Sequence, residues 1–329
     1  MLRIALLGCG RIGQMHAELL SSRVGGVQIA KLYDAVPEVA GHLADRYDLD
    51  VAPSLDEALA GVDAVAICTS TDTHAELIIR AAGSGLATFC EKPISLDLPT
   101  VDATLAAVDQ AGTYLQVGFN RRFDPAHEAV RAAVADGSLG TLCLVKITSR
   151  DRLPPPVAYL ARSGGMFLDM TIHDFDMARF ISGSDIVEVH AAVGAALVDP
   201  AIAEIGDVDT SVVVLRHATG CLTVIDNSRQ AVYGYDQRVE ALGTYGVAIS
   251  ETPPRHSAVI GDDQRIAGAV LPDSFIDRYE TSFVRQWQSF VGNVVAGAPP
   301  AVSGHDARVP LVAGLAAVES MATGRPVRL

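Results

Sequence analysis

The sequence predicts an α/β protein: a Rossmann-type, doubly wound parallel sheet followed by an α+β domain with a large, open-faced, mostly antiparallel sheet. Three observations support this prediction. Short apolar runs alternate with helical patterns over the first third of the chain. A glycine-rich turn, GCGRIG at 8–13, follows the first apolar run and opens a helical pattern. From Ile186 onward, segments of alternating polarity are joined by short turns, which is typical of antiparallel strands.

Length and composition narrow the class of protein. A chain of 329 residues is long enough for two domains, which we place at 1–121 and 122–329, with the option that a C-terminal helix packs back on the first. The net charge of −14 argues against nucleic-acid or anionic-membrane partners. Five scattered cysteines without a CxxC pair indicate small buried side chains rather than disulfides or zinc ligands. The first apolar run is too short for a signal peptide or a membrane span, so we expect a soluble, cytoplasmic protein.

The glycine motif has the context that a dinucleotide site requires. The apolar run Leu2–Leu7 predicts a buried strand and leads directly into the motif. Gly8 would make the tight turn, Gly10 would let the backbone approach a pyrophosphate, and Gly13 would allow close packing of helix on strand. The pyrophosphate would lie at the helix N-terminus. A plain strand–turn–helix without a cofactor is the alternative interpretation.

An acid follows the second predicted strand at the expected distance. The strand Val27–Tyr33 ends at Asp34, which lies 21 residues beyond Gly13 and would accept hydrogen bonds from the adenosine ribose. Ala35 and Val36 follow, with no cation to neutralise a 2′-phosphate, so the pattern favours NAD over NADP. Arg11 and Ile12 lie within the motif and are also expected at the cofactor.

Helices and strands continue to alternate up to about residue 121. The expected helices are Pro37–Tyr47, Ser54–Leu59 with Ser54 as N-cap, Asp72–Ala82 and Asp97–Ala111; the expected strands are Val51, Ala64–Cys68, Ala87–Cys90 and Tyr114–Val117. Ligands of doubly wound sheets bind outside the carboxyl ends of the strands, so the loop Thr69–His74 should border the cofactor. Thr69, Ser70 and His74 are therefore cofactor candidates, and ordinary helix capping is an equally good explanation of the hydroxyls.

Glu91-Lys92-Pro93 directly follows another predicted strand. A lysine at this edge of the sheet can be partly desolvated, which lowers the pKa of its amine. Glu91 and Lys92 would then lie beside the cofactor; the alternative is a surface lysine in a turn. Pro93 is compatible with a cis bond before it, although most X–Pro bonds are trans.

The second part of the chain has a different pattern. We expect helices at Pro125–Ala135, from Gly164 to Phe180, at Tyr279–Ala296 and at His305–Thr323, an extended loop at Arg150–Pro156, and strands at Leu142–Ser149, Val187–Leu197, Asp209–Arg216, Cys221–Ser228, Gln237–Gly243 and Val247–Ser250. A large sheet with one layer of helices leaves an open face, which indicates an oligomer.

Asp169, His173 and Asp176 stand out in the predicted helix after Gly164-Gly165. Their spacings of four and three place them on one face of an α-helix. Two acids and an imidazole cost stability if they are buried without partners, so the set is either a functional site or acids near a helix start with one structural histidine. No second histidine recurs at ligand spacing, and we expect no metal.

Several motifs together resemble those of the Gfo/Idh/MocA oxidoreductases. These are GCGRIG, EKP at 91–93 and GGMFLDMTIHDFDMARF at 164–180. Within that family, FCEKPI, GFNRRFD, TSRD and NSRQAVYGYDQR are most similar to the inositol 2-dehydrogenases. The resemblance implies NAD-dependent oxidation of the axial hydroxyl of myo-inositol to a 2-keto inosose (scyllo-inosose), a small-molecule polyol substrate and a homotetramer.

The resemblance also implies roles for single residues. The catalytic set falls on Lys92, Asp169 and His173, and further polyol contacts fall on Asp176, Arg121 and Tyr235. The Arg150–Pro156 loop reads DRLPPP at 151–156 rather than the DPxPPP form of the subgroup, which puts substrate contacts from this loop in doubt.

The chemistry of alcohol oxidation fits these residues. The hydroxyl proton needs a base with a pKa near neutrality, which suits His173, and Asp169 would orient its imidazole. Lys92 would donate to the reacting oxygen, so that the reaction would lie in the cleft between the domains. Two alternatives remain: the same chemistry on another cyclitol (scyllo- or chiro-inositol) or an aldose sugar, and a non-catalytic NAD(H)-binding regulator.

Overall fold

The computed structural model describes residues 1–193 and 196–329. Contacts between Cα atoms divide the chain into two units: the first contains residues 1–120 and 281–309, and the second contains 121–280 and 310–329. The first unit therefore includes a late segment of the chain in addition to the predicted N-terminal domain. The division falls close to Tyr279, where the backbone is not helical, and at Pro310, which lies inside a helix.

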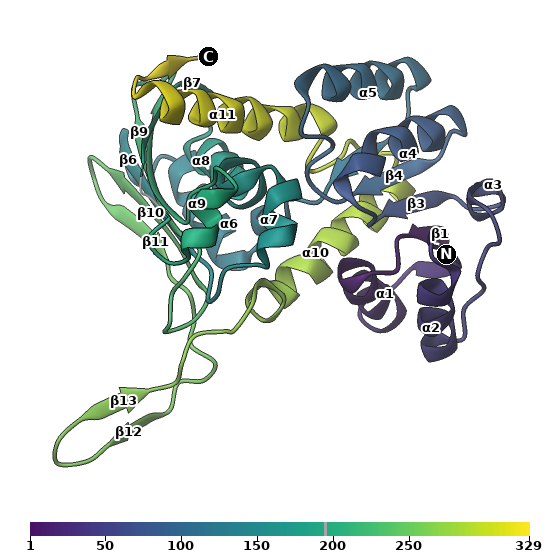
Figure 1. The fold of residues 1–329 in the computed structure, drawn as a ribbon, viewed down its shortest axis with the longest axis horizontal. Coiled ribbons are helices and arrows are strands. Elements are labelled where there is room, and N and C mark those ends of the chain that lie inside the picture. Colours follow the sequence, from purple (N-terminus) through teal and green to yellow (C-terminus); the bar gives the residue numbers. More distant parts are fainter. Residues whose placement is uncertain (194–195) are drawn as a thin grey trace. The chain divides into compact units, whose positions relative to one another are not determined.

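The first unit is built on a parallel sheet with strand order β2-β1-β3-β4-β5, of which β1, β3 and β4 are labelled in Figure 1. The strands are β1 Leu2–Leu7, β2 Val27–Tyr33, β3 Ala64–Ile67, β4 Ala87–Cys90 and β5 Leu115–Val117. Because β1 pairs with β2 on one side and β3 on the other, the order of the strands reverses at β1. Ligands of such sheets bind at this reversal, outside the carboxyl ends of β1 and β3.

Helices connect these strands, as the alternating pattern predicts. They are α1 Arg11–Ser22, α2 Pro37–Tyr47, α3 Leu55–Leu59, α4 Thr71–Gly83 and α5 Leu98–Ala111, and α10 Phe275–Ala296 adds its residues from Thr281 onward. The predicted cap of α3 is confirmed, since the Ser54 hydroxyl accepts from the Glu57 amide at 3.2 Å. Val51, predicted as a short strand, forms a parallel bridge to Leu32.

The second unit is built on a mixed sheet with strand order β11-β10-β6-β9-β8-β7-β14. The strands are β6 Leu142–Arg150, β7 Ile186–Val193, β8 Thr210–His217, β9 Leu222–Ser228, β10 Asp236–Gly243, β11 Val247–Ser250 and β14 Val327–Arg328. β6 and β9 pair in parallel and the other neighbours pair antiparallel, which confirms the predicted mostly antiparallel sheet.

Helices of this unit lie against one face of the sheet (Figure 1). The helical segments are η1 Asn120–Phe123, α6 Pro125–Ala135, α7 Val157–Ser163, η2 Met166–Met170, α8 Ile172–Ser182, α9 Pro200–Glu204 and α11 Gly304–Thr323. The inward side chains of β6, among them Val145 and Ile147, pack with Phe175 and Ile181 of α8 in a buried apolar core.

The opposite face of the sheet exposes large apolar side chains. Val212, Leu242, Val247 and Ile249 are 41–54% exposed, as expected where no layer of helices covers a sheet. The predicted open-faced sheet is thus confirmed. No helix among the described residues is both long and apolar enough to cross a bilayer.

The sequence prediction is wrong for the segment after Gly164. One α-helix was expected up to Phe180, but α7 ends at Ser163, a π-helical turn covers Met166–Met170, and α8 follows. The predicted strand Val187–Leu197 corresponds to β7 and also includes residues 194–195, which lie outside the described residues. The prediction missed α7, α9 and a hairpin formed by β12 Val259–Gly261 and β13 Ile266–Gly268.

Candidate active site

The glycine loop after β1 has little room for side chains. Gly8 has φ +89°, and a Cβ there would meet the Cys68 carbonyl carbon at 2.6 Å. A Cβ on Gly13 would lie 1.9 Å from the Gly8 carbonyl oxygen, so only glycine allows α1 to start against the loop. Around Gly10, by contrast, no described atom lies within 4 Å of an added Cβ. The backbone at Gly10 therefore faces open space at the start of α1.

This open space fits a dinucleotide pyrophosphate. Gly10 is the N-cap of α1 and offers no side chain to cap the first turn of the helix. The first turn also carries no acid. Its amide groups can thus donate to phosphate oxygens, with the helix dipole adding to the attraction.

Asp34 is held against the same loop. Its Oδ2 accepts from the Cys9 amide at 2.7 Å, and its Oδ1 accepts from the Val36 amide at 2.9 Å. Each carboxylate oxygen keeps further acceptor capacity for ribose hydroxyls. The structure thus brings the predicted ribose acceptor to the glycine loop.

His74 occupies a buried position that ties two loops together. Its Nδ1 lies 2.8 Å from the Pro93 carbonyl oxygen, and its Nε2 lies 3.2 Å from that of Thr69. Burial lowers the pKa of His74, so the ring is neutral at pH 7 and donates to one of the two carbonyls. These contacts give His74 a structural role, and its contact with the cofactor stays a prediction.

The segment carrying Lys92 follows β4 in the same unit. The Lys92–Pro93 bond is cis. The Lys92 amide donates to Glu91 Oε2 at 3.3 Å, and the lysine side chain is half-buried. Glu91 Oε1 lies 2.8 Å from Nε2 of His16, a residue of α1. The loop with Lys92 is therefore fixed to the helix that starts at the glycine loop.

In the second unit, two glycines and an acid shape the π-helical turn. Gly164 and Gly165 have φ of +90° and +76°, which side chains rarely adopt. The Met166 amide then donates to Asp207 Oδ1 at 2.9 Å. The Thr171 amide bonds to the Met166 carbonyl at 2.9 Å, five residues back, so the turn holds one residue more than an α-turn.

Asp169 and His173 are more exposed to solvent than the residues around them in the sequence. From Met166 to Ala178, these two residues are half-buried and all the others are buried. The structure therefore gives two of the three predicted polar residues an accessible position. Asp176 is only 1% exposed.

Asp169 is held by groups from two other segments. The Tyr159 hydroxyl donates to Oδ1 at 2.9 Å, and Nη1 of Arg229 lies 3.7 Å from Oδ2. The Arg229 guanidinium is buried and also lies 3.6 Å from Asp207, the acid that binds the Met166 amide. A single cation thus faces both the accessible carboxylate and the acid that stabilises the turn.

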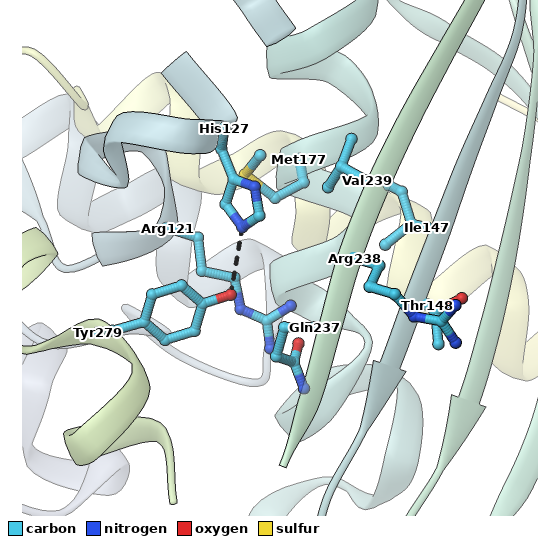
Figure 2. A pocket seen from close by; sticks show the side chains of 9 residues that line it. All are labelled: Arg121, His127, Ile147, Thr148, Met177, Gln237, Arg238, Val239 and Tyr279. Carbon is cyan, nitrogen blue, oxygen red and sulfur yellow. Dashed lines mark hydrogen bonds between the residues drawn. The ribbon is translucent and has the colours of Figure 1, made fainter. Parts of the chain in front are cut away.

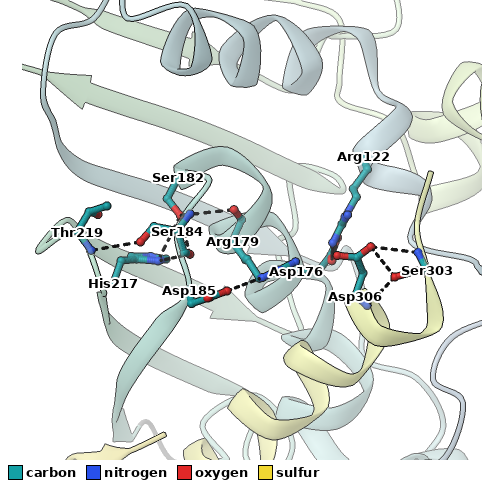
Figure 3. A network of polar contacts seen from close by, with 10 residues as sticks. All are labelled: Arg122, Asp176, Arg179, Ser182, Ser184, Asp185, His217, Thr219, Ser303 and Asp306. Carbon is teal, nitrogen blue, oxygen red and sulfur yellow. Dashed lines mark hydrogen bonds and ion pairs between the residues drawn. The ribbon is translucent and has the colours of Figure 1, made fainter. Parts of the chain in front are cut away.

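Asp176 forms a buried ion pair with Arg122 (Figure 3). Arg122 Nε donates to both carboxylate oxygens at 3.1 and 2.9 Å, and Nη2 donates to Oδ1 at 2.6 Å. Such bidentate geometry occupies much of the acceptor capacity of the carboxylate. The ion pair joins η1 to α8, and the proposed contact of Asp176 with a substrate stays a prediction.

Arg121 is also buried in an ion pair. Its Nη1 donates to Asp174 Oδ1 at 2.7 Å, and the Asn227 amide donates to Asp174 Oδ2 at 2.8 Å. Burial raises the pKa of Asp174, and the Arg121 charge opposes that shift. Arg121 lies beside Tyr279 in Figure 2, and the Tyr279 ring packs edge-on against Tyr235. Arg121 and Tyr235 thus belong to one buried polar cluster, and their substrate contacts stay predictions.

Asp151 adds another acid near Asp169. It follows β6, and its amide donates to the Ser228 carbonyl of the parallel strand β9 at 2.9 Å. Burial raises the pKa of the Asp151 carboxyl to about 6, while Arg229 and Arg121 oppose the shift. Asp151 and Arg229 therefore both lie directly beyond the carboxyl ends of β6 and β9.

Sequence reasoning missed several residues of this region. They are the residues that hold the predicted ones in place: Ser149, Asp151, Tyr159, Asp174, Asp207, Asn227 and Arg229. Asn227 and Arg229 lie within the motif NSRQAVYGYDQR, which could have pointed to them. Asp207 lies in a different segment from its partners, and no local pattern marks it. In the described chain, no group of three or more His, Cys, Asp and Glu side chains is placed to hold a metal ion.

Two known sequence families match most of the chain. An oxidoreductase family with an NAD-binding Rossmann fold matches residues 2–119. The GFO/IDH/MocA C-terminal domain matches residues 127–249.

Curated relatives align over nearly the whole chain. The myo-inositol 2-dehydrogenase of Thermotoga maritima is 43% identical, covering 100% of this chain and 98% of the relative. The inositol 2-dehydrogenase of Rhizobium meliloti is 45% identical, covering 99% of each. The scyllo-inositol 2-dehydrogenase (NAD(+)) of Bacillus subtilis is 34% identical, covering 99% of this chain and 96% of the relative.

Solved structures share the fold. A probable dehydrogenase from Thermotoga maritima superposes with a TM-score of 0.97 at 42% identity, covering 99% of this chain and 98% of that one. A scyllo-inositol dehydrogenase from Lactobacillus casei, solved with NAD(H) and scyllo-inositol, has a TM-score of 0.91 at 25% identity, covering 100% and 99%.

The Rossmann unit with its open glycine loop, together with these matches, defines an NAD-dependent dehydrogenase. The chain belongs to the Gfo/Idh/MocA oxidoreductase family, as its motifs predict.

Proposed function

We propose that this enzyme oxidises myo-inositol with NAD to a 2-keto inosose (scyllo-inosose). The names of the two curated relatives above 40% identity support the substrate. The observation that carries the proposal is the placement of Asp169 and His173, the two accessible residues in an otherwise buried stretch. A carboxylate and an imidazole that both keep partial access to solvent suit the removal of a proton from a hydroxyl.

The residues have distinct proposed roles. His173 takes the hydroxyl proton, because an imidazole exchanges protons near neutral pH. Asp169, held by Tyr159 and Arg229, stabilises the imidazolium that forms. Lys92 assists by donating to the reacting oxygen as negative charge develops on it. The glycine loop and Asp34 would hold NAD, which would supply the acceptor for the hydride.

The residues that we propose to contact NAD all lie in the first unit. They are Gly8, Gly10, Arg11, Ile12 and Gly13 of the glycine loop, Asp34 at the ribose, and Thr69, Ser70, His74, Glu91 and Lys92. Asp34 lies at the glycine loop through its contacts with the Cys9 and Val36 amides, and Ala35 and Val36, which follow it, supply no cation to neutralise a 2′-phosphate, so we expect NAD rather than NADP.

A substrate panel tests the proposal. Among myo-, scyllo- and chiro-inositol and glucose, the purified protein should reduce NAD with the highest kcat/KM for myo-inositol. With NADP in place of NAD, the kcat/KM for the cofactor should be much lower. His173→Ala and Lys92→Ala should lose turnover but still bind NADH. Near-wild-type kcat/KM in either variant would remove that residue from the mechanism.

Two other outcomes have defined meanings. A higher kcat/KM for scyllo-inositol would match the name of the Bacillus subtilis relative and would change the substrate but not the chemistry. NADH binding without turnover on any cyclitol or aldose would indicate a non-catalytic NAD(H)-binding regulator.

We also propose a homotetramer in the cytoplasm. The exposed apolar residues on the open face of the sheet support assembly, since such faces are commonly covered by another subunit. All of the cysteines lie in the described residues and are free thiols, which is typical of a reducing compartment.

A further inference from the structure

A buried chain of hydrogen bonds joins Trp287, His16 and Glu91 in the first unit. The Trp287 indole Nε1 donates to Nδ1 of His16 at 2.9 Å, and Nε2 of His16 lies 2.8 Å from Oε1 of Glu91. The side chains of His16 and Trp287 are fully buried. These hydrogen bonds end at Glu91, the residue before Lys92, and Lys92 is the residue proposed to assist the reaction.

This arrangement permits one form of the His16 ring. An indole N–H is a donor only, so Nδ1 of His16 must accept and cannot carry a proton. The proton of the neutral ring is therefore on Nε2, where it is donated to Glu91. An imidazolium would set two N–H groups against each other at 2.9 Å. The contact with Trp287 thus fixes Nε2 of His16 as the donor to Glu91.

Glu91 is confined from other directions as well. Its Oε2 accepts from the Lys92 amide at 3.3 Å, and a Cβ on Gly118 would lie 3.0 Å from the carboxyl carbon. The His16 ring packs edge-on against Phe89, with ring centroids 5.5 Å apart. The carboxylate therefore has little freedom to find another donor.

We infer that His16 is a positioning residue for the reaction. Through Glu91 it fixes the backbone at Lys92, and with it the place from which the ammonium group acts. Because His16 lies on α1, the same contact ties the helix at the glycine loop to the loop that carries Lys92. This inference rests on the role proposed above for Lys92.

Three variants distinguish a positioning role of His16 from a role in packing the core alone. His16→Phe removes both hydrogen bonds, and His16→Gln keeps an amide that can donate to Glu91. Phe290→Leu is the matched control: its ring packs against Trp287 and Phe89 at 5.4 and 6.0 Å, but it makes no polar contact in this chain of bonds. All three are assayed below their melting temperatures.

We expect His16→Phe to lower kcat about tenfold or more, with the KM for the polyol within about threefold of the wild type, because misplaced catalytic groups chiefly cost turnover. His16→Gln should restore most of the loss, and Phe290→Leu should keep the wild-type kcat. Wild-type kcat in His16→Phe, or an equal loss in Phe290→Leu, would overturn the inference.

A second measurement does not depend on turnover. Competitive reductive methylation of the full-length protein, read by mass spectrometry across pH, gives the reactivity and apparent pKa of the Lys92 amine. His16→Phe should change both, and Phe290→Leu should change neither. If the wild type oxidises no polyol, the proposed function fails, and this labelling still decides the positioning role: unchanged labelling of Lys92 in His16→Phe overturns it.

Discussion

At the scale of single residues, polar side chains that look alike in the sequence differ in their burial and in their partners. Asp169 and Asp176 both lie close to His173 in the chain. Asp169 is accessible and held by Tyr159, whereas Asp176 is buried and paired with Arg122. The first arrangement leaves a carboxylate that can respond to a change of charge nearby, and the second joins two segments of the fold.

Tyr159→Phe should weaken catalysis without unfolding the protein. The variant removes the hydroxyl that donates to Asp169 and keeps the half-exposed ring. A lost hydrogen bond to a carboxylate costs about 1.5–3 kcal/mol when it is buried, and less at a partly exposed site, so kcat with myo-inositol should fall about five- to tenfold. Tyr245→Phe, an exposed tyrosine outside the site, is the control. Equal kcat values in both variants would contradict the role of Tyr159.

His127 should make stability depend on pH. Its ring is buried, its Nε2 lies 3.3 Å from the Tyr279 hydroxyl, and burial lowers the pKa of His127 to about 4 (Figure 2). Asp124 opposes this shift, and the charges of Arg278 and Arg121 add to it. As pH falls below 6.5, His127 binds a proton in the unfolded chain but stays neutral in the folded one. The free energy of unfolding therefore falls until about pH 4.

The matched variant is His127→Gln, whose amide can still reach the Tyr279 hydroxyl. Between pH 7 and 5, urea unfolding should show the wild type losing about 1–2 kcal/mol more than the variant. Other buried histidines are present in both proteins and cancel in the comparison. Parallel stability curves would show that His127 is not held neutral.

At the scale of elements, the π-helical turn is the feature that local patterns do not reveal. Spacings of four and three predicted one α-helix, because that rule assumes 3.6 residues per turn throughout. The turn forms because Gly164 and Gly165 supply positive φ and Asp207, from a distant segment, binds the Met166 amide. Turns with an extra residue often occur at functional sites, and this one carries Asp169.

Two glycines with the same φ test the contact with Asp207. Gly165 and Gly206 both have φ +76°, but a Cβ on Gly165 would lie 2.9 Å from Asp207 Oδ1, whereas a Cβ on Gly206 meets no described atom within 4 Å. Alanine at either site should cost about 1 kcal/mol for the left-handed backbone. Gly165→Ala should cost about 1 kcal/mol more and lower kcat, because it displaces Asp207. Equal losses of stability in the two variants would show that the turn tolerates the side chain.

The elements that sequence predicted well are those with strong local signals. The glycine motif, the cap at Ser54 and the buried strands of the first unit follow from neighbours in the chain. The residues that hold the site could not be predicted in this way. Asp207 and Arg229 approach Asp169 only after separate segments have packed together, so their spacing in the sequence carries no signal.

At the scale of the whole molecule, the open face of the mixed sheet should determine assembly. Ile249→Arg places a charge among exposed apolar side chains of β11 and its neighbours, and burying that charge in an interface would cost several kcal/mol. Light scattering should show the wild type as a tetramer and Ile249→Arg as a smaller species. Val295→Arg, at an exposed position on α10, should remain a tetramer. A tetrameric Ile249→Arg would exclude this face as the interface.

The parallel pairing of β6 with β9 also has a consequence for how the second unit folds. The two strands pair Leu144 with Leu222 and Arg150 with Ser228, so about eighty residues separate the paired positions and must be synthesised before the strands can meet. Asp151 and Arg229 directly follow these strands at their carboxyl ends, and Arg229 lies near Asp169. Closing so long a loop is slow in comparison with forming a hairpin. During synthesis, the helices after Gly164 therefore emerge before β9 does, and Asp169 gains its cationic partner only once β9 has joined the sheet.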